Sequence, residues 1–257
     1  MLLVIDVGNT NIVLGVFDQN KLKNSYRIST KNNTTSDEYS ATISQLLHMD
    51  HIHVDDIDDV IISSVVPEVM HSLENFVMKY LKKMPIIVGP GVKTGINIKY
   101  ENPSQVGADR IVNAVAGFEK YGGPLIIIDF GTATTFCYIN KAGEYIGGLI
   151  APGIQISSEA LFQKASKLHK VELLKPKSVV GKNTTVAIQA GIFYGYVGLV
   201  DNVIDQIKAE TGEADCKVIS TGGLASLIIP ESRNTDIIDK NLTLDGLRLI
   251  YEKNKAN

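Results

Sequence analysis

Two stretches of the chain carry the same arrangement of chemistry-bearing residues. Residues 2–11 read LLVIDVGNTN, and residues 125–134 read LIIIDFGTAT. In both, an apolar run ends in Asp-x-Gly and is followed by hydroxyl or amide side chains. Glycine lets backbone N–H groups approach a phosphate closely, and hydroxyls and amides can donate to phosphate oxygens or to a metal's water shell. Two such turns facing each other could hold the phosphate tail of a nucleotide from both sides.

A third candidate is the segment 105–115, QVGADRIVNAV, which the pattern predicts as a helix after the turn at Asn102-Pro103. Asp109 and Arg110 stand side by side near the start of this helix. One interpretation is that Asp109 complements the helix dipole and Arg110 is solvated. The other is that Asp109 accepts a proton from an attacking hydroxyl while Arg110 pairs with an anionic group of the substrate. The residues alone leave both interpretations open.

Three further motifs are less informative. Residues 180–184 (VGKNT) and 89–94 (GPGVKT) resemble parts of a P-loop. In the first, Pro176 stands where the first glycine should be, and in the second no glycine directly precedes Lys93. Three histidines between residues 48 and 53 lie in a polar segment without metal-site spacing. We therefore expect a phosphate site that is not of the P-loop kind and histidines that lie on the surface.

The elements that must position these residues follow the same order twice. In the first half we predict a hairpin at 2–17, a strand at 22–29, a helix at 36–49 with Ser36 as its N-cap, a strand at 59–64, a helix at 67–82 and a strand at 85–88. In the second half we predict a hairpin at 125–139, a strand at 145–149, a helix from about 154, a helix at 184–211, a strand at 217–221 and a helix opened by Gly222-Gly223.

This repetition indicates an α/β protein with two similar lobes, each a mixed β-sheet flanked by helices. The break at residues 122–124, Gly-Gly-Pro, is the best candidate for the boundary. We therefore expect an N-terminal lobe at 1–122 and a C-terminal lobe at 123–257. Gene duplication accounts for the repeat most simply.

Composition narrows the class of protein. The chain has 257 residues, of which 44% are hydrophobic and 21% charged, and its net charge is −3. These values predict a globular chain with disorder only in the polar tail 254–257. The densest basic cluster, residues 79–83, lies at the end of a predicted helix, where cations suit the helix dipole. Binding to nucleic acid is therefore not expected.

No secretory leader is expected, and no apolar run approaches the roughly 20 residues that span a bilayer. Cys137 and Cys216 show no metal or redox spacing, so we expect buried, reduced thiols. These features predict a cytoplasmic protein with no membrane segment. On the predicted helix 184–211, Ala187, Gly191 and Gly195 recur every four residues. They allow close approach either of another helix of the same chain or of a second copy in a homodimer.

The two phosphate turns, together with a Gly-Gly turn after a buried strand, resemble the actin-like (ribonuclease H-like) ATPase fold of sugar kinases and chaperone ATPases. That fold implies duplicated lobes with a cleft between them. Within it, nearly the whole chain is similar to the type III pantothenate kinases. The resemblance is carried by residues 6–11, 89–95, 100–103, 107–110, 129–135, 147–148, 152–153, 181–184 and 221–224.

The resemblance implies transfer of a phosphoryl group from ATP to the primary hydroxyl of pantothenate, giving 4'-phosphopantothenate in the first step of coenzyme A biosynthesis. It assigns ATP binding to Asp6, Val7, Gly8, Asn9, Thr10, Asn11, Ile12, Val13 and Thr132. It assigns pantothenate binding to Tyr100, Gly107, Ala108, Asp109, Arg110 and Thr184.

The same resemblance gives individual roles. Asp109 would be the general base, Asp6 would approach Mg²⁺ through water, and Asp129 would bind a monovalent cation, K⁺ or NH₄⁺. It also implies a homodimer with the substrate site near the subunit interface, in agreement with the small residues at 187–195.

One departure from the wider superfamily is the apolar stretch Ile12-Val13-Leu14, where many actin-like kinases carry a long polar side chain. Charge must then be neutralised by Mg²⁺, the monovalent cation and backbone N–H groups. We therefore expect weak nucleotide affinity and a strong dependence on the monovalent cation. Two alternatives share the phosphate turns: a kinase of this superfamily acting on a sugar or a short carboxylic acid, and a regulator that only binds nucleotide.

Overall fold

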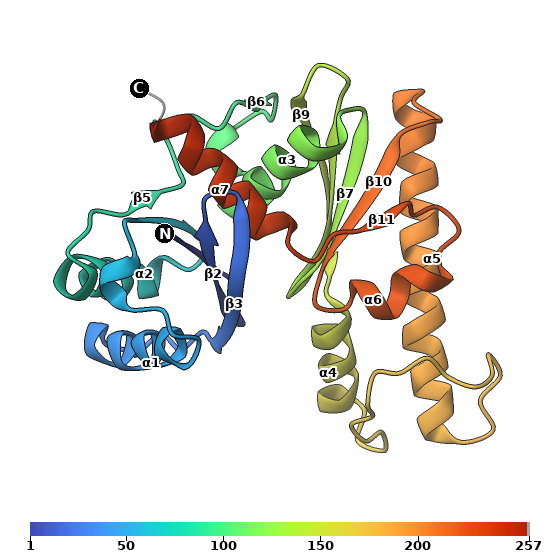
Figure 1. The fold of residues 1–257 in the computed structure, drawn as a ribbon. Coiled ribbons are helices and arrows are strands. Elements are labelled where there is room, and N and C mark those ends of the chain that lie inside the picture. The colour runs from blue at the N-terminus through green and yellow to red at the C-terminus, as the bar shows by residue number, and fades with distance from the viewer. Residues whose placement is uncertain (256–257) are drawn as a thin grey trace. The chain divides into compact units, whose positions relative to one another are not determined.

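The computed structural model describes residues 1–255, which divide into two compact units (Figure 1). The first unit contains residues 1–96 and 101–116 and the C-terminal segment from Asn241 onward. The second contains residues 97–100 and 117–240.

A five-stranded mixed sheet, in the order β3-β2-β1-β4-β5, forms the centre of the first unit. Strand β1 is antiparallel to β2 and parallel to β4. The strands are β1 (Leu2–Val7), β2 (Asn11–Asp18), β3 (Lys21–Ser29), β4 (Asp59–Ser64) and β5 (Ile86–Ile87). The helices of this unit are α1 (Ser36–Met49), α2 (Pro67–Phe76), α7 (Leu242–Lys255) and the first part of α3 (Ala108–Tyr121), with 3₁₀ turns at Val54–Asp56 and Pro103–Gln105.

Alternate residues of β1 belong to two different cores, because successive side chains of a strand point to opposite faces. Leu3, Ile5 and Val7 pack with residues of α1 and α2. Leu2 and Val4 pack with residues of α3 and α7 on the other face. Asp6 has the parity of Leu2 and Val4, so the fold directs its side chain to the face that α3 and α7 cover.

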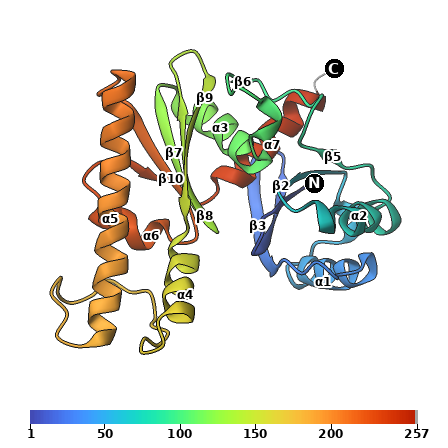
Figure 2. The same ribbon diagram turned by 180° about the vertical axis from the view of Figure 1, so that it is seen from behind.

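The second unit is built on a six-stranded sheet in the order β11-β10-β7-β8-β9-β6. Its strands are β6 (Asn97–Ile98), β7 (Leu125–Phe130), β8 (Ala133–Ile139), β9 (Glu144–Pro152), β10 (Lys217–Gly222) and β11 (Ile237–Ile238). Its helices are α4 (Ile154–Lys164), α5 (Thr184–Thr211) and α6 (Ala225–Ile228), with a 3₁₀ turn at Ile229–Glu231. Figure 2 shows α5 running along this sheet.

The alternation in β7 matches that in β1. Ile126, Ile128 and Phe130 pack in one core with residues of α5 and α6. Ile127 points to the opposite face, where a Cβ on Gly117 of α3 would lie 2.6 Å from its Cδ1 atom. Asp129 has the parity of Ile127 and therefore shares that face.

The strand order β3-β2-β1-β4-β5 is repeated as β9-β8-β7-β10-β11, with β6 added beside β9. The register is repeated as well, since Asp6 lies opposite Ser63 in the β1–β4 pair and Asp129 opposite Thr221 in the β7–β10 pair. The predicted α/β fold with a duplicated mixed sheet is therefore confirmed.

Several details differ from the sequence prediction. The N-cap of α1 is Thr35, which forms a capping box with Glu38, and not Ser36. The helix predicted at 67–82 is α-helical only to Phe76 and continues as a π-turn over Val77–Leu81. Strands β6 and β11 were not predicted, because each has only two residues, too few to show an alternation of apolar and polar side chains.

Helix α7 was not predicted, and it places the C-terminal segment in the first unit. Leu244, Leu247 and Ile250 pack there against Leu2 and Val4. The observed division of the chain thus differs from the expected lobes 1–122 and 123–257.

The expected disorder in the tail 254–257 is wrong for its first two residues, since Asn254 and Lys255 lie in α7. Asn254 accepts a hydrogen bond from the Lys93 amide (3.1 Å) and donates one to the Lys93 carbonyl (2.9 Å). The rest of the tail lies outside the described residues.

Helix α5 has the length and apolar composition of a membrane span, with 44% of its most apolar window buried inside the protein. No apolar run of this length was expected from the sequence. One face of α5 explains the composition, because Phe193, Tyr196, Val200 and Ile204 belong to the core of the second unit. Core helices of soluble proteins pass the same test.

Candidate active site

The first Asp-x-Gly turn joins β1 to β2 and is fixed by a residue outside it. Within the turn, the Gly8 amide donates to the Asn11 carbonyl (3.0 Å). Thr30, just after β3, donates its hydroxyl to the Gly8 carbonyl (2.6 Å) and its amide to the Thr10 carbonyl (3.0 Å). With these carbonyls engaged, the exposed Asn9 and Thr10 form the tip of the turn. Sequence reasoning missed the role of Thr30, because it lies 20 residues from the turn that it anchors.

Asp6 lies at the carboxyl end of β1 and is partly buried. The hydroxyl of Ser63 donates to its Oδ1 atom over 3.0 Å. Val7 and Ile12, on either side of the turn, are fully buried in the apolar core. Of the nucleotide ligands expected at 6–13, these two can therefore offer only backbone groups to a ligand.

Asp109 lies in the first turn of α3, near the same end of the first sheet. An ideal Cβ on Gly107 would lie 2.5 Å from Asp109 Oδ1 and 3.5 Å from Cγ1 of Val65. Val65 follows β4 directly, and its amide donates to the Val7 carbonyl (3.0 Å). The first unit therefore brings Asp109 close to the segment where β1 and β4 end, and Gly107 leaves room for its carboxylate.

Burial raises the pKa of Asp109 above its ordinary value. The Arg110 amide and the Arg110 charge oppose this shift, and the amide donates to Asp109 Oδ1 over 2.8 Å. The guanidinium group of Arg110 donates from Nη2 to the Gln105 carbonyl (3.2 Å), which leaves its other donors for a ligand. A desolvated carboxylate beside a guanidinium group is suited to accept a proton near an anionic substrate.

The second Asp-x-Gly turn joins β7 to β8 in the second unit. The Gly131 amide donates to the Ala133 carbonyl (3.1 Å), and the Gly153 amide donates to the Thr132 carbonyl (3.0 Å). A Cβ on Gly153 would lie 2.1 Å from the Thr132 oxygen. Only glycine at position 153 therefore lets the end of β9 pack against this turn. Thr132 itself is exposed.

Asp129 is the next-to-last residue of β7 and lies beside Gly222, the last residue of β10. Gly222 has a φ of +93°, and a Cβ there would lie 2.6 Å from Asp129 Oδ1. Glycine is the residue that tolerates this backbone conformation. Without a side chain, Gly222 also lets the Asp129 carboxylate and the Phe130 backbone pack directly against it.

The remaining expected substrate ligands lie in the second unit. The ring of Tyr100 packs edge-on against Tyr145 (centroids 6.4 Å apart) and lies beside Gly147 of β9. Thr184 is the first residue of α5 and is exposed. Asn183 caps this helix, accepting from the Val186 amide over 2.9 Å. Of the expected site residues, Asp6, the 8–13 turn, Asp109 and Arg110 lie in the first unit. Tyr100, Asp129, Thr132 and Thr184 lie in the second.

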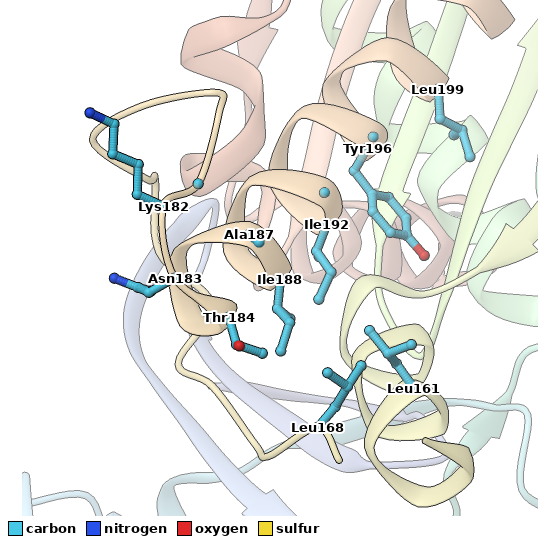
Figure 3. A pocket seen from close by; sticks show the side chains of 13 residues that line it. Leu161, Leu168, Lys182, Asn183, Thr184, Ala187, Ile188, Ile192, Tyr196 and Leu199 are labelled. Atoms are coloured by element: carbon cyan, nitrogen blue, oxygen red, sulfur yellow. The ribbon is translucent and has the colours of Figure 1, made fainter. Parts of the chain in front are cut away.

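An apolar groove of about 770 Å³ begins at Thr184 (Figure 3). In Figure 3, Leu161 of α4 and Leu168 face Ile188 and Ile192 of α5 across it. The groove is lined by Leu161, Leu168, Gly181, Lys182, Asn183, Thr184, Ala187, Ile188, Gly191, Ile192, Gly195, Tyr196 and Leu199.

The donor set suits a weakly held divalent cation. Among residues 1–255, no group of three or more His, Cys, Asp or Glu residues is placed to hold a metal ion. Mg²⁺ in nucleotide enzymes is typically held by one or two carboxylates, several waters and the substrate's phosphates. Asp6, whose Oδ1 atom accepts a hydrogen bond from Ser63, fits such a partial site.

The duplicated sheets with acidic turns at the ends of β1 and β7 define the actin-like ATPase and sugar kinase fold, and similar solved structures agree. A Campylobacter jejuni protein, described as a Baf family transcriptional activator, has a TM-score of 0.62 at 20% identity and covers 99% of this chain and 100% of its own. A Sinorhizobium meliloti protein, described as a 2-dehydro-3-deoxygalactonokinase, has a TM-score of 0.61 at 10% identity, with coverages of 98% and 96%. At these identities the likeness concerns the fold alone.

Sequence comparison identifies the family. Residues 2–206 match the profile of the type III pantothenate kinases. A type III pantothenate kinase from Geobacillus sp. (strain WCH70) is 58% identical over 254 residues, covering 99% of this chain and 98% of the relative. The chain belongs to the type III pantothenate kinase family, and it is thereby a kinase that uses ATP and acts on pantothenate in coenzyme A biosynthesis.

Proposed function

We propose that this chain phosphorylates the primary hydroxyl of pantothenate with Asp109 as general base. The observation that carries the proposal is the position of the half-buried Asp109 carboxylate, which lies close to the end of the strand pair that contains Asp6. Burial raises the pKa of this carboxyl group. A base works best when its pKa is near the working pH and when it is not fully solvated.

In this proposal Asp109 orients the attacking hydroxyl and accepts its proton, and Arg110 pairs with the substrate's carboxylate. Tyr100, Gly107, Ala108 and Thr184 complete the pantothenate site. The turn residues 6–13 and Thr132 bind ATP, mainly through backbone groups and the short side chains at the tips. Phosphoryl transfer requires positioning and charge stabilisation more than covalent chemistry by the protein, and these residues supply both.

Asp6 would hold Mg²⁺ through water, and Asp129 would hold a monovalent cation, K⁺ or NH₄⁺. When bound, these cations neutralise charge on the phosphate oxygens. The close packing of Gly222 against the Asp129 carboxylate, which holds this carboxylate at the end of the sheet, supports the second assignment. No cationic side chain follows the first turn, where residues 12–14 are apolar, which supports a strong dependence on cations.

We also propose that the chain works as a homodimer whose interface includes the apolar groove along α5. Gly191 and Gly195 line this groove, and a Cβ on either would meet nothing within 4 Å. A stripe without side chains lets another backbone approach closely. Because Thr184 lies at one end of the groove, a second copy seated there would adjoin a residue of the proposed substrate site. A cytoplasmic location, without nucleic acid or membrane, is the setting that we propose for this enzyme.

The decisive experiment measures phosphate transfer from ATP to a panel of acceptors: pantothenate, hexoses, N-acetylglucosamine and short hydroxy acids. We expect transfer to pantothenate alone. Faster transfer to a sugar or to another acid would assign the chain to a different substrate, and nucleotide binding without any transfer would indicate a regulator.

A further inference from the structure

We propose that Ser63 is a positioning residue for Asp6, and that its hydroxyl fixes the carboxylate for the metal that accompanies the nucleotide. The inference rests on the proposed role of Asp6 and concerns a residue that the family resemblance does not assign. Its basis is a single contact, in which Ser63 Oγ donates to Asp6 Oδ1 over 3.0 Å.

The β-sheet register brings the two side chains together. Ser63 is the residue of β4 directly opposite Asp6 of β1, in a parallel pair that runs without interruption from Leu2 to Val7. Neighbouring strands lie about 4.8 Å apart, and paired residues project to the same face. The contact therefore depends on the sheet itself and not on a loop, so its geometry is as rigid as the core around it.

Burial makes the hydroxyl an effective partner. Ser63 is 0% exposed, and its three preceding neighbours on the strand, residues 60–62, are buried and apolar. A hydroxyl in such a place is destabilising if it has no partner, and water cannot compete for the carboxylate from this side. A hydrogen bond to an ionised oxygen is also about twice as strong as a neutral one. Engaging Oδ1 in this way restricts rotation of the carboxylate and sets the direction of Oδ2.

The duplicated half supports a functional reason for the hydroxyl. Thr221 occupies the same register position opposite Asp129 in the β7–β10 pair and is 3% exposed. Both acidic turns therefore have a buried hydroxyl residue on the neighbouring parallel strand. Residues of this kind that orient a metal-binding group typically change metal affinity roughly 10- to 100-fold when removed.

The test compares Ser63→Ala with Ser64→Ala. Ser64 is the next residue of β4, but its hydroxyl accepts from the Val66 amide (3.0 Å) and does not contact Asp6. Binding of Mn²⁺ is measured by electron paramagnetic resonance in the presence of a non-hydrolysable ATP analogue, with the wild type as reference. We expect about tenfold weaker Mn²⁺ binding in Ser63→Ala, unchanged binding in Ser64→Ala, and a matching rise in the Mg²⁺ concentration needed for half-maximal kinase activity.

Ser63→Thr should restore near-normal Mn²⁺ binding, since threonine is the residue found at the equivalent position 221. Mn²⁺ affinity that is normal in Ser63→Ala, or equally weakened in Ser64→Ala, would overturn the proposal. If Ser63→Ala does not fold, Ser63→Cys keeps the volume while weakening the donor, and normal Mn²⁺ binding there would overturn it too. Failure of the proposed role of Asp6 itself looks different, because Asp6→Asn would then bind Mn²⁺ as tightly as the wild type.

Discussion

Asp109 shows how one carboxyl group acquires a reactive environment from its neighbours. Its Oδ1 atom accepts a hydrogen bond from the Arg110 amide. Only glycine at position 107 leaves room for this oxygen, since a Cβ on residue 107 would lie 2.5 Å from it. Burial raises its pKa, while the Arg110 charge keeps the ionised form accessible. The same features that suit a base also make its ionised form costly to the fold.

Replacement of Asp109 by Asn should separate activity from stability. We expect kcat to fall roughly 10²- to 10⁴-fold, the usual loss when a general base is removed. Because an amide oxygen can still accept from the Arg110 amide and carries no charge to bury, the melting temperature should stay equal or rise. Steady-state kinetics and thermal unfolding at pH 7 measure both.

Asp215→Asn, in an exposed loop, is the control and should change neither kcat nor the melting temperature. Near-normal turnover in Asp109→Asn would exclude it as the base.

The pH dependence of kcat should report the raised pKa of Asp109. A base must be ionised, so the rate is lost as the pH falls through this pKa, and the acidic limb should lie above the ordinary value of 3.8. The pKa is raised in the folded state, so ionisation of Asp109 lowers stability as the pH rises through the window between the unfolded and folded values. Measuring kcat at saturating substrate avoids titration of free pantothenate. An acidic limb that persists in the residual activity of Asp109→Asn would assign it to another group.

At the scale of elements, both acidic turns are held by segments that are distant in sequence. Thr30 anchors the first turn, Gly153 packs on the second, and Gly222 at the end of β10 adjoins Asp129. In each case a residue at the end of a neighbouring strand shapes the acidic turn. The conformation of each turn therefore depends on the neighbouring strands of the sheet and not on the Asp-x-Gly sequence alone.

The contact between Gly222 and Asp129 gives a prediction about the monovalent cation. We expect exchange of K⁺ for Na⁺ to suppress activity, and Asp129→Asn to abolish the response to K⁺. Gly222→Ala should also lower the K⁺ response, because its Cβ would lie 2.6 Å from Asp129 Oδ1. Initial rates over a K⁺ titration at constant ionic strength measure these effects.

Gly212→Ala is the matched control for this experiment. Gly212 also has a positive φ, +73°, which is unfavourable to alanine, but a Cβ there would meet nothing within 4 Å. It should cost roughly 1–2 kcal/mol of stability through backbone strain and leave the K⁺ response intact. Equal rates in K⁺ and Na⁺ for the wild type would remove the role assigned to Asp129.

At the scale of the whole molecule, α5 presents one face to the core of the second unit and leaves the groove-lining face open. The buried face carries Phe193, Val200 and Ile204. The open face carries Ala187, Gly191 and Gly195 beside exposed apolar residues such as Leu161. A 28-residue helix that is apolar on both faces is explained if a second copy of the chain covers the open one.

Gly195→Glu should therefore convert the proposed dimer to a monomer. A charged side chain in the groove would be buried by the partner at a cost that the interface cannot offset. Analytical ultracentrifugation measures the mass, and pantothenate kinetics should show a raised KM, since Thr184 lies at the end of the same groove. Ala209→Glu, an exposed position near the other end of α5, should leave the dimer intact. A wild-type protein that sediments as a monomer would refute the proposal directly.

Local patterns in the sequence were sufficient for the two acidic turns, the strands around them and the full extent of α5, because apolar periodicity and turn residues act over a few positions. The tertiary structure alone decided that α7 returns to the first sheet, that Ser63 lies opposite Asp6, and that Asp109 approaches Val65. These contacts join residues 40 or more positions apart, and they depend on strand register and helix packing. Strand register and helix packing are not visible in the local sequence around the residues that they bring together.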